Sequence, residues 1–172
     1  MRSRAAVRVV SPLQWLIYPA LIAIAGSVVL ATPLRILGMT LPEPVLPAVL
    51  AFAWPVIRPS VLGAAVSFGL GIVLDLLWGG PLGLWPLFLV VIYGLSLLGR
   101  VVMSGLETVL LFLGYGVTLL TAFGLVWLAS AALTGMLPSL SALFWQFLPT
   151  LLLFPAANWL IERFDDGEVR FL

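Results

Sequence analysis

The 172-residue chain contains no cysteine, no histidine and no lysine, and charged residues make up only 9% of it. Without cysteine it can form no disulfide, no thiolate nucleophile and no thiolate-ligated metal site. Without histidine it lacks the commonest general base and metal ligand, and without lysine it cannot form a Schiff base. We therefore expect a protein without catalytic activity, metal or cofactor.

Hydrophobic residues make up 63% of the chain, which places it in the membrane class and excludes an ordinary soluble domain. Its length suits one compact all-α bundle, a single transmembrane domain over residues 1–172. No basic cluster that could bind nucleic acid is present. The expected environment of the protein is therefore the lipid bilayer.

Apolar runs separated by proline, glycine and charged residues predict six transmembrane helices. The second run is short, because 13 residues of helix cover only about 20 Å of a hydrocarbon core near 30 Å. It either crosses a locally thinned bilayer or is re-entrant, and a re-entrant segment has to be shielded by protein. Pro149 and Pro155 should kink the last helix. The approximate spans are residues 14–31, 42–57, 60–78, 82–99, 106–133 and 138–161.

The arginines predict how the chain is oriented in the membrane. If all six segments cross, seven of the eight arginines fall on one side, and only Arg35 lies opposite. The positive-inside rule then places both termini in the cytoplasm and the residues 79–83 turn near the outer face. The seven are Arg2, Arg4, Arg8, Arg58, Arg100, Arg163 and Arg170.

Asp75 is the only aspartate inside a long apolar run. A charge at bilayer depth costs roughly 2.5–3.5 kcal/mol on insertion scales, so the carboxylate needs a partner or water. Asp75 shares one helix face with Gly63, Ser67 and Gly71, each four residues apart. A stripe of small residues allows a second helix to approach closely. The pattern predicts a tightly packed helix that ends at a polar group and a sharp turn.

Two interpretations of Asp75 are open. As an intramembrane acid it could form a coupling site for an ion or substrate. Alternatively it accepts hydrogen bonds from the turn after Trp78, or caps the next helix at its N-terminus. We favour the structural interpretation because the turn is only a few residues away. A second stripe, Ala23, Ser27 and Ala31, either packs within the bundle, which we favour, or docks a partner.

Other polar residues carry simpler expectations. Arg100 and Glu107 could form an ion pair at the cytoplasmic interface, worth at most about 1 kcal/mol. Gln146 and Asn158 are most simply interhelical hydrogen-bonding groups. Neither set predicts a reaction.

Residues 71–84, GIVLDLLWGGPLGL, resemble the G-x-x-x-D-x-x-x-G-x-P-L-G signature of the rod shape-determining protein MreD family. The proline-rich first loop, the short second segment and a fourth helix with Tyr93 are also similar to that family's pattern. The acidic tail after Arg163 has no counterpart that we can assign. The matching positions are Gly71, Asp75, Gly79, Pro81, Leu82 and Gly83, with Pro59 and Arg100 as further matches.

The resemblance implies a non-enzymatic role in the cell-elongation machinery of rod-shaped bacteria. It implies an inner-membrane protein that binds the bitopic protein MreC and works with MreB, RodA and a penicillin-binding protein in peptidoglycan synthesis. The implied fold is similar to the six-helix substrate-binding subunits of energy-coupling-factor transporters. The resemblance therefore predicts a membrane scaffold.

An alternative function follows from the same hydropathy pattern. A small-molecule-binding subunit of an energy-coupling-factor transporter could use Asp75 or Asn158 to contact a vitamin-like ligand. Such a cavity needs a few convergent polar groups. The outer half of this chain offers few of them, which weakens the alternative.

Overall fold

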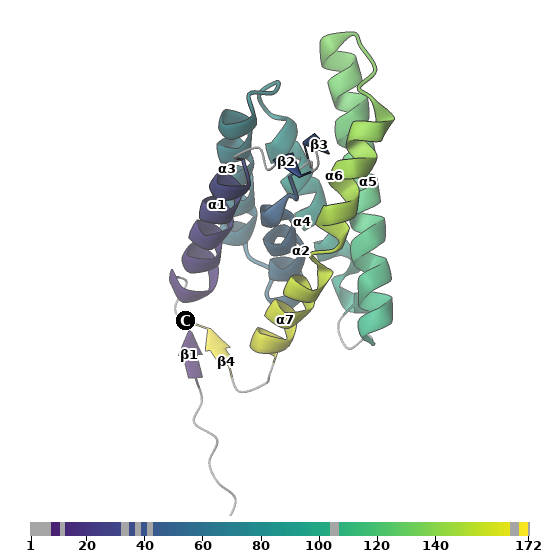
Figure 1. Ribbon diagram of the computed structural model, residues 1–172. Coiled ribbons are helices and arrows are strands. Elements are labelled where there is room, and N and C mark those ends of the chain that lie inside the picture. The colour runs from purple at the N-terminus through teal and green to yellow at the C-terminus, as the bar shows by residue number, and fades with distance from the viewer. Residues whose placement is uncertain are drawn as a thin grey trace, which may run out of the picture.

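The computed structural model describes residues 8–10, 13–31, 35–36, 39–40, 43–103, 107–165 and 169–171. Most of these residues are helical, and the helices run side by side in one bundle (Figure 1). A π-helical turn, η1, leads into the first α-helix. The helices are η1 (Leu13–Ile17), α1 (Tyr18–Leu30), α2 (Leu46–Ile57), α3 (Val61–Trp78), α4 (Leu84–Met103), α5 (Thr108–Thr134), α6 (Leu140–Leu151) and α7 (Phe154–Asp165).

Helix α2 forms the centre of the bundle. Every residue from Pro47 to Val56 is buried, because α1, α3, α4 and α7 all pack against this helix. Its 12 residues span only about 18 Å. The protein shielding that a re-entrant second segment requires is therefore present.

Four helices are long and apolar enough to cross a membrane: α3, α4, α5 and the α6–α7 stretch Leu140–Phe164. The segments Gln14–Leu30 and Leu46–Ile57 are apolar but shorter. Large apolar side chains cover much of the outer surface, among them Val61, Leu98 and Val101. Such a surface suits contact with lipid, so the fold is that of a helical membrane protein.

Each of the six predicted ranges contains helix, but several boundaries differ from the prediction. Helix α2 begins at Leu46, four residues after the predicted start of its range at residue 42. Helix α4 begins at Leu84 and continues past Arg100 to Met103, because a long arginine side chain can reach water from the helix end. The last range is divided into α6 and α7, and the break lies between Pro149 and Pro155. The kink expected from these prolines is a two-residue turn, Leu152–Leu153, between the two helices.

The described residues also include four short strands that were not predicted. Arg35–Ile36 (β2) and Met39–Thr40 (β3) form an antiparallel pair. Arg8–Val10 (β1) pairs in parallel with Val169–Phe171 (β4), which brings the two terminal segments together. Figure 1 shows β1 and β4 at one end of the bundle, opposite the α3–α4 and α5–α6 turns.

Candidate functional site

The carboxylate of Asp75 holds the turn between α3 and α4. Its side chain is only 2% exposed. Oδ2 accepts a hydrogen bond from the backbone N–H of Gly83 at 2.6 Å, and Oδ1 accepts one from Trp85 N–H at 3.1 Å. These N–H groups belong to the start of α4, where a negative charge is favoured. They are the bonds that the structural interpretation of Asp75 predicts.

Two glycines let the chain reach this carboxylate. Gly79 ends α3 with a positive φ of +66°, and its N–H donates to the Asp75 carbonyl at 3.0 Å. Gly83 has a φ of +100°. Both angles lie in the region that residues with a Cβ rarely adopt. The two glycines of the signature therefore shape the turn around Asp75.

The stripe below Asp75 forms the contact between α3 and α4. A Cβ on Gly71 would lie 2.7 Å from the Trp85 carbonyl carbon and would also meet the Pro86 backbone. A Cβ on Gly63 would lie 3.2 Å from the Tyr93 ring. Ser67 is fully buried, and its hydroxyl donates to the Gly63 carbonyl at 2.9 Å. The small residues thus serve close helix packing within the chain itself.

A second hydrogen-bonded contact fixes the opposite end of this helix pair. The Tyr93 hydroxyl of α4 donates to the Ser60 carbonyl at 2.7 Å and accepts from the Ser60 N–H at 2.9 Å. Ser60 is also the N-cap of α3. The α3–α4 hairpin is therefore fastened at the turn by Asp75 and at its other end by Tyr93.

Aromatic side chains connect the turn to the α5–α6 hairpin. Trp78 and Trp85 meet edge to face with ring centroids 4.5 Å apart, and Trp85 meets Phe88 at 5.4 Å. Phe88 then contacts Phe123 of α5, which contacts Phe147 of α6. Each such pair adds about 0.5–1.5 kcal/mol beyond area burial. The turn is thus packed into a series of rings that crosses the molecule.

The other signature positions lie at the surface. Pro59, Pro81 and Leu82 are exposed, and Leu82 points its large side chain away from the core with 77% of it accessible. Arg100 is half-buried in the last turn of α4, where a positive charge is favoured. The structure thus places the predicted site residues between Gly63 and Gly83 along the α3–α4 contact and its turn. Pro59 and Arg100 lie outside this contact.

The small residues of α1 also face inward. Ala23 and Ser27 are buried and Ala31 is partly buried. Packing within the bundle, which the sequence favoured, therefore accounts for this stripe. Neither stripe is open to a partner helix.

Two polar expectations were wrong. Within the described residues no ion pair joins Arg100 to Glu107. Asn158 does not bond across helices: its amide donates to Glu162 of the same helix at 2.7 Å. Partly exposed groups such as Arg100 and Asn158 can bond locally or to water, so no interhelical partner is required. For Gln146, the bond seen uses its backbone carbonyl, which accepts from the Thr150 hydroxyl.

Sequence reasoning missed a buried polar cluster at the α6–α7 break. The Thr150 hydroxyl accepts from the Val45 N–H at the start of α2 at 3.1 Å, and the Tyr115 hydroxyl of α5 donates to the Thr150 carbonyl at 2.9 Å. Thr150 and Tyr115 are fully buried. The two prolines signalled that backbone groups here would need partners, but no local pattern identifies those partners.

The Asp75 site positions α3 against α4. Both Asp75 oxygens already accept backbone N–H groups. The described residues contain no group of three or more His, Cys, Asp or Glu side chains placed to hold a metal ion. Searches against family models, curated proteins and solved structures found no match.

Proposed function

We propose that this protein is a membrane scaffold of the MreD type, which binds an MreC-like bitopic protein and supports peptidoglycan synthesis during cell elongation. One observation carries the proposal: three residues of the MreD-like signature, Asp75, Gly79 and Gly83, form a hydrogen-bonded turn between α3 and α4. Such a turn fixes the position of α3 relative to α4, and a bundle held in this way offers partner proteins a constant surface. MreB, RodA and a penicillin-binding protein complete the proposed assembly.

The proposed location is the bacterial inner membrane, with six crossings and both termini in the cytoplasm. The apolar helices and the one-sided arginines support it. The parallel pairing of β1 with β4 also supports it, because both terminal segments then lie at one end of the bundle. In this orientation Asp75 and the α3–α4 turn face the periplasmic side.

The partner's transmembrane helix has to contact an outward face, since both small-residue stripes are used inside the chain. Helix α6 is the least covered helix, because Thr150 is its one buried residue. Phe144, Trp145 and Leu148 of α6 are exposed. We therefore expect photocrosslinks to the MreC-like protein from Phe144 and Leu148, and none from the buried Ser67.

The test uses a rod-shaped bacterium depleted of its own MreD. The wild-type chain should restore cell width and capture MreC. Asp75→Asn removes one acceptor and places an amide group against backbone donors, so it should lower the folded protein level or MreC capture. Glu107→Gln, which changes an exposed carboxylate without a side-chain cap bond, is the matched control.

Two outcomes would contradict these expectations. A fully folded Asp75→Asn protein that captures MreC and supports normal width would refute the role given to Asp75. A wild-type chain that reaches the membrane, captures no MreC and leaves cell width uncorrected would refute the scaffold itself.

The transporter-subunit alternative has less support. Its two candidate ligand contacts already have partners, since Asp75 accepts from Gly83 and Trp85 and Asn158 donates to Glu162. Copurification of a vitamin-like compound, or thermal stabilisation by one, would favour this alternative over the scaffold.

A further inference from the structure

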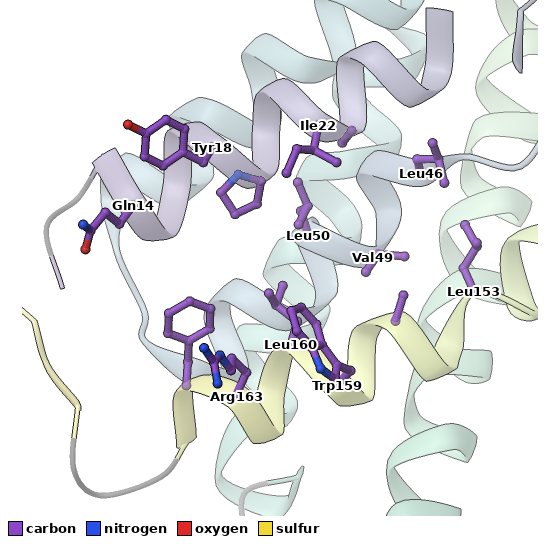
Figure 2. Close-up of a pocket in the computed structure, with 14 residues that line it drawn as sticks. Gln14, Tyr18, Ile22, Leu46, Val49, Leu50, Leu153, Trp159, Leu160 and Arg163 are labelled. Carbon is purple, nitrogen blue, oxygen red and sulfur yellow. The ribbon is translucent and has the colours of Figure 1, made fainter. Parts of the chain in front are cut away.

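A lateral groove lies between α1, α2 and α7. Its volume is about 390 Å³, within the range of cavities that hold small ligands. Figure 2 shows its walls: Ile22 from α1, Val49 and Leu50 from α2, and Leu160 from α7. None of these residues belongs to the Asp75 site. We call it the α1–α7 groove.

The α1–α7 groove is polar at one end only. Gln14, Tyr18 and Arg163 lie at one end of it, whereas Leu46 and Leu153 lie toward the other (Figure 2). Arg163 is the one charged residue among those that line the groove. The groove therefore suits an elongated molecule with an anionic head and an apolar tail.

Charge favours a lipid over an apolar partner helix as the occupant. Arg163 at the polar end of the groove can pair with a phosphate, and the apolar walls beyond it can cover an acyl chain.

We propose that the α1–α7 groove binds an anionic phospholipid, with one acyl chain along Ile22, Leu50 and Leu160 and the phosphate at Arg163. Basic pockets between transmembrane helices bind anionic headgroups in this way. The exposed ring of Trp159 lies beside Arg163 in Figure 2, and indole rings favour the headgroup level. The proposal does not depend on the scaffold function.

Native mass spectrometry of the full chain in detergent tests the proposal, with phosphatidylglycerol and phosphatidylcholine of identical acyl chains as probes. The wild-type protein should retain phosphatidylglycerol more tightly. Arg163→Gln should weaken phosphatidylglycerol binding about fivefold, as expected for one interfacial charge, and weaken phosphatidylcholine binding less, because choline offsets the charge of its phosphate. Arg100→Gln is the matched control, because Arg100 also lies in the last turn of its helix but outside the groove.

Groove-filling variants test the acyl-chain site. Ala156→Trp should reduce binding of both lipids, because Ala156 lines the groove and is exposed. Ile22→Trp fills the groove from the opposite wall and keeps the test valid if one variant misfolds. Ala65→Trp, on an exposed face of α3, is the control that should have no effect.

Equal retention of the two lipids by the wild-type protein, or an unaltered preference after Arg163→Gln, would overturn the headgroup assignment. Unchanged lipid retention in folded Ala156→Trp and Ile22→Trp proteins would overturn the groove assignment. Loss of MreC capture in these variants, with lipid retention intact, would instead identify the groove as a protein-docking surface.

Discussion

Gly71 and Gly69 lie two residues apart in α3, and their surroundings differ completely. Gly71 is buried where the α4 backbone approaches at Trp85 and Pro86. At Gly69 a Cβ would meet nothing within 4 Å. An added methyl group therefore tests helix propensity at Gly69 and the distance between α3 and α4 at Gly71.

We expect Gly71→Ala to destabilise the folded protein by about 1–3 kcal/mol, the usual cost of forcing atoms into a filled site. Gly69→Ala should be neutral or stabilising by up to about 1 kcal/mol, since alanine favours helix over glycine. Unfolding in mixed micelles of increasing SDS fraction, followed by circular dichroism, measures both. Equal effects at the two positions would show that α3 and α4 do not touch at Gly71.

At the scale of elements, the short central helix depends on a residue far away in the chain. The N–H of Val45 finds its acceptor in Thr150, 105 residues later. Because α2 is enclosed by other helices, water cannot replace that acceptor. The start of α2 and the α6–α7 break therefore hold each other in place.

Thr150→Val keeps the shape of the side chain but removes the acceptor of the Val45 N–H. We expect a loss of about 1–3 kcal/mol, the cost of a buried donor left unsatisfied. Thr121→Val is the matched control, since Thr121 also donates to the carbonyl four residues earlier but is exposed. The same unfolding assay compares them, and a Thr150→Val protein as stable as the Thr121→Val protein would disprove the coupling.

These elements could be predicted where the interacting residues lie close together in the sequence. Helix α3 was predicted almost to the residue, because Pro59, Ser60 and Gly79 mark its ends locally. The Asp75 bonds were predictable for the same reason, since their donors follow within ten residues. The Thr150 bond and the β1–β4 pair join distant segments, and nothing near either segment identifies its partner.

At the scale of the whole molecule, the cysteine-free sequence makes the proposed orientation easy to test. Single cysteines can be placed at exposed positions in the connections between helices. Leu82 and Met136 lie in the α3–α4 and α5–α6 turns, while Pro59 and Glu107 lie in the connections at the other end.

In intact cells, an impermeant maleimide should label Leu82→Cys and Met136→Cys from the periplasmic side. It should leave Pro59→Cys and Glu107→Cys unlabelled until the cells are lysed, since alternate connections of crossing helices lie on opposite sides. Labelling of Pro59→Cys and Leu82→Cys from one side would mean that α3 does not cross the bilayer.

The enclosed position of α2 also has a consequence for biosynthesis. This helix leaves the ribosome long before α7, one of the helices that cover it. Until α7 is inserted, one side of α2 is not covered by protein. A helix of 12 residues with Pro55 near its end is poorly accommodated by hydrocarbon alone. Chains interrupted before the last helix would thus display an early segment that membrane proteases can recognise, so quality control could distinguish finished from unfinished copies.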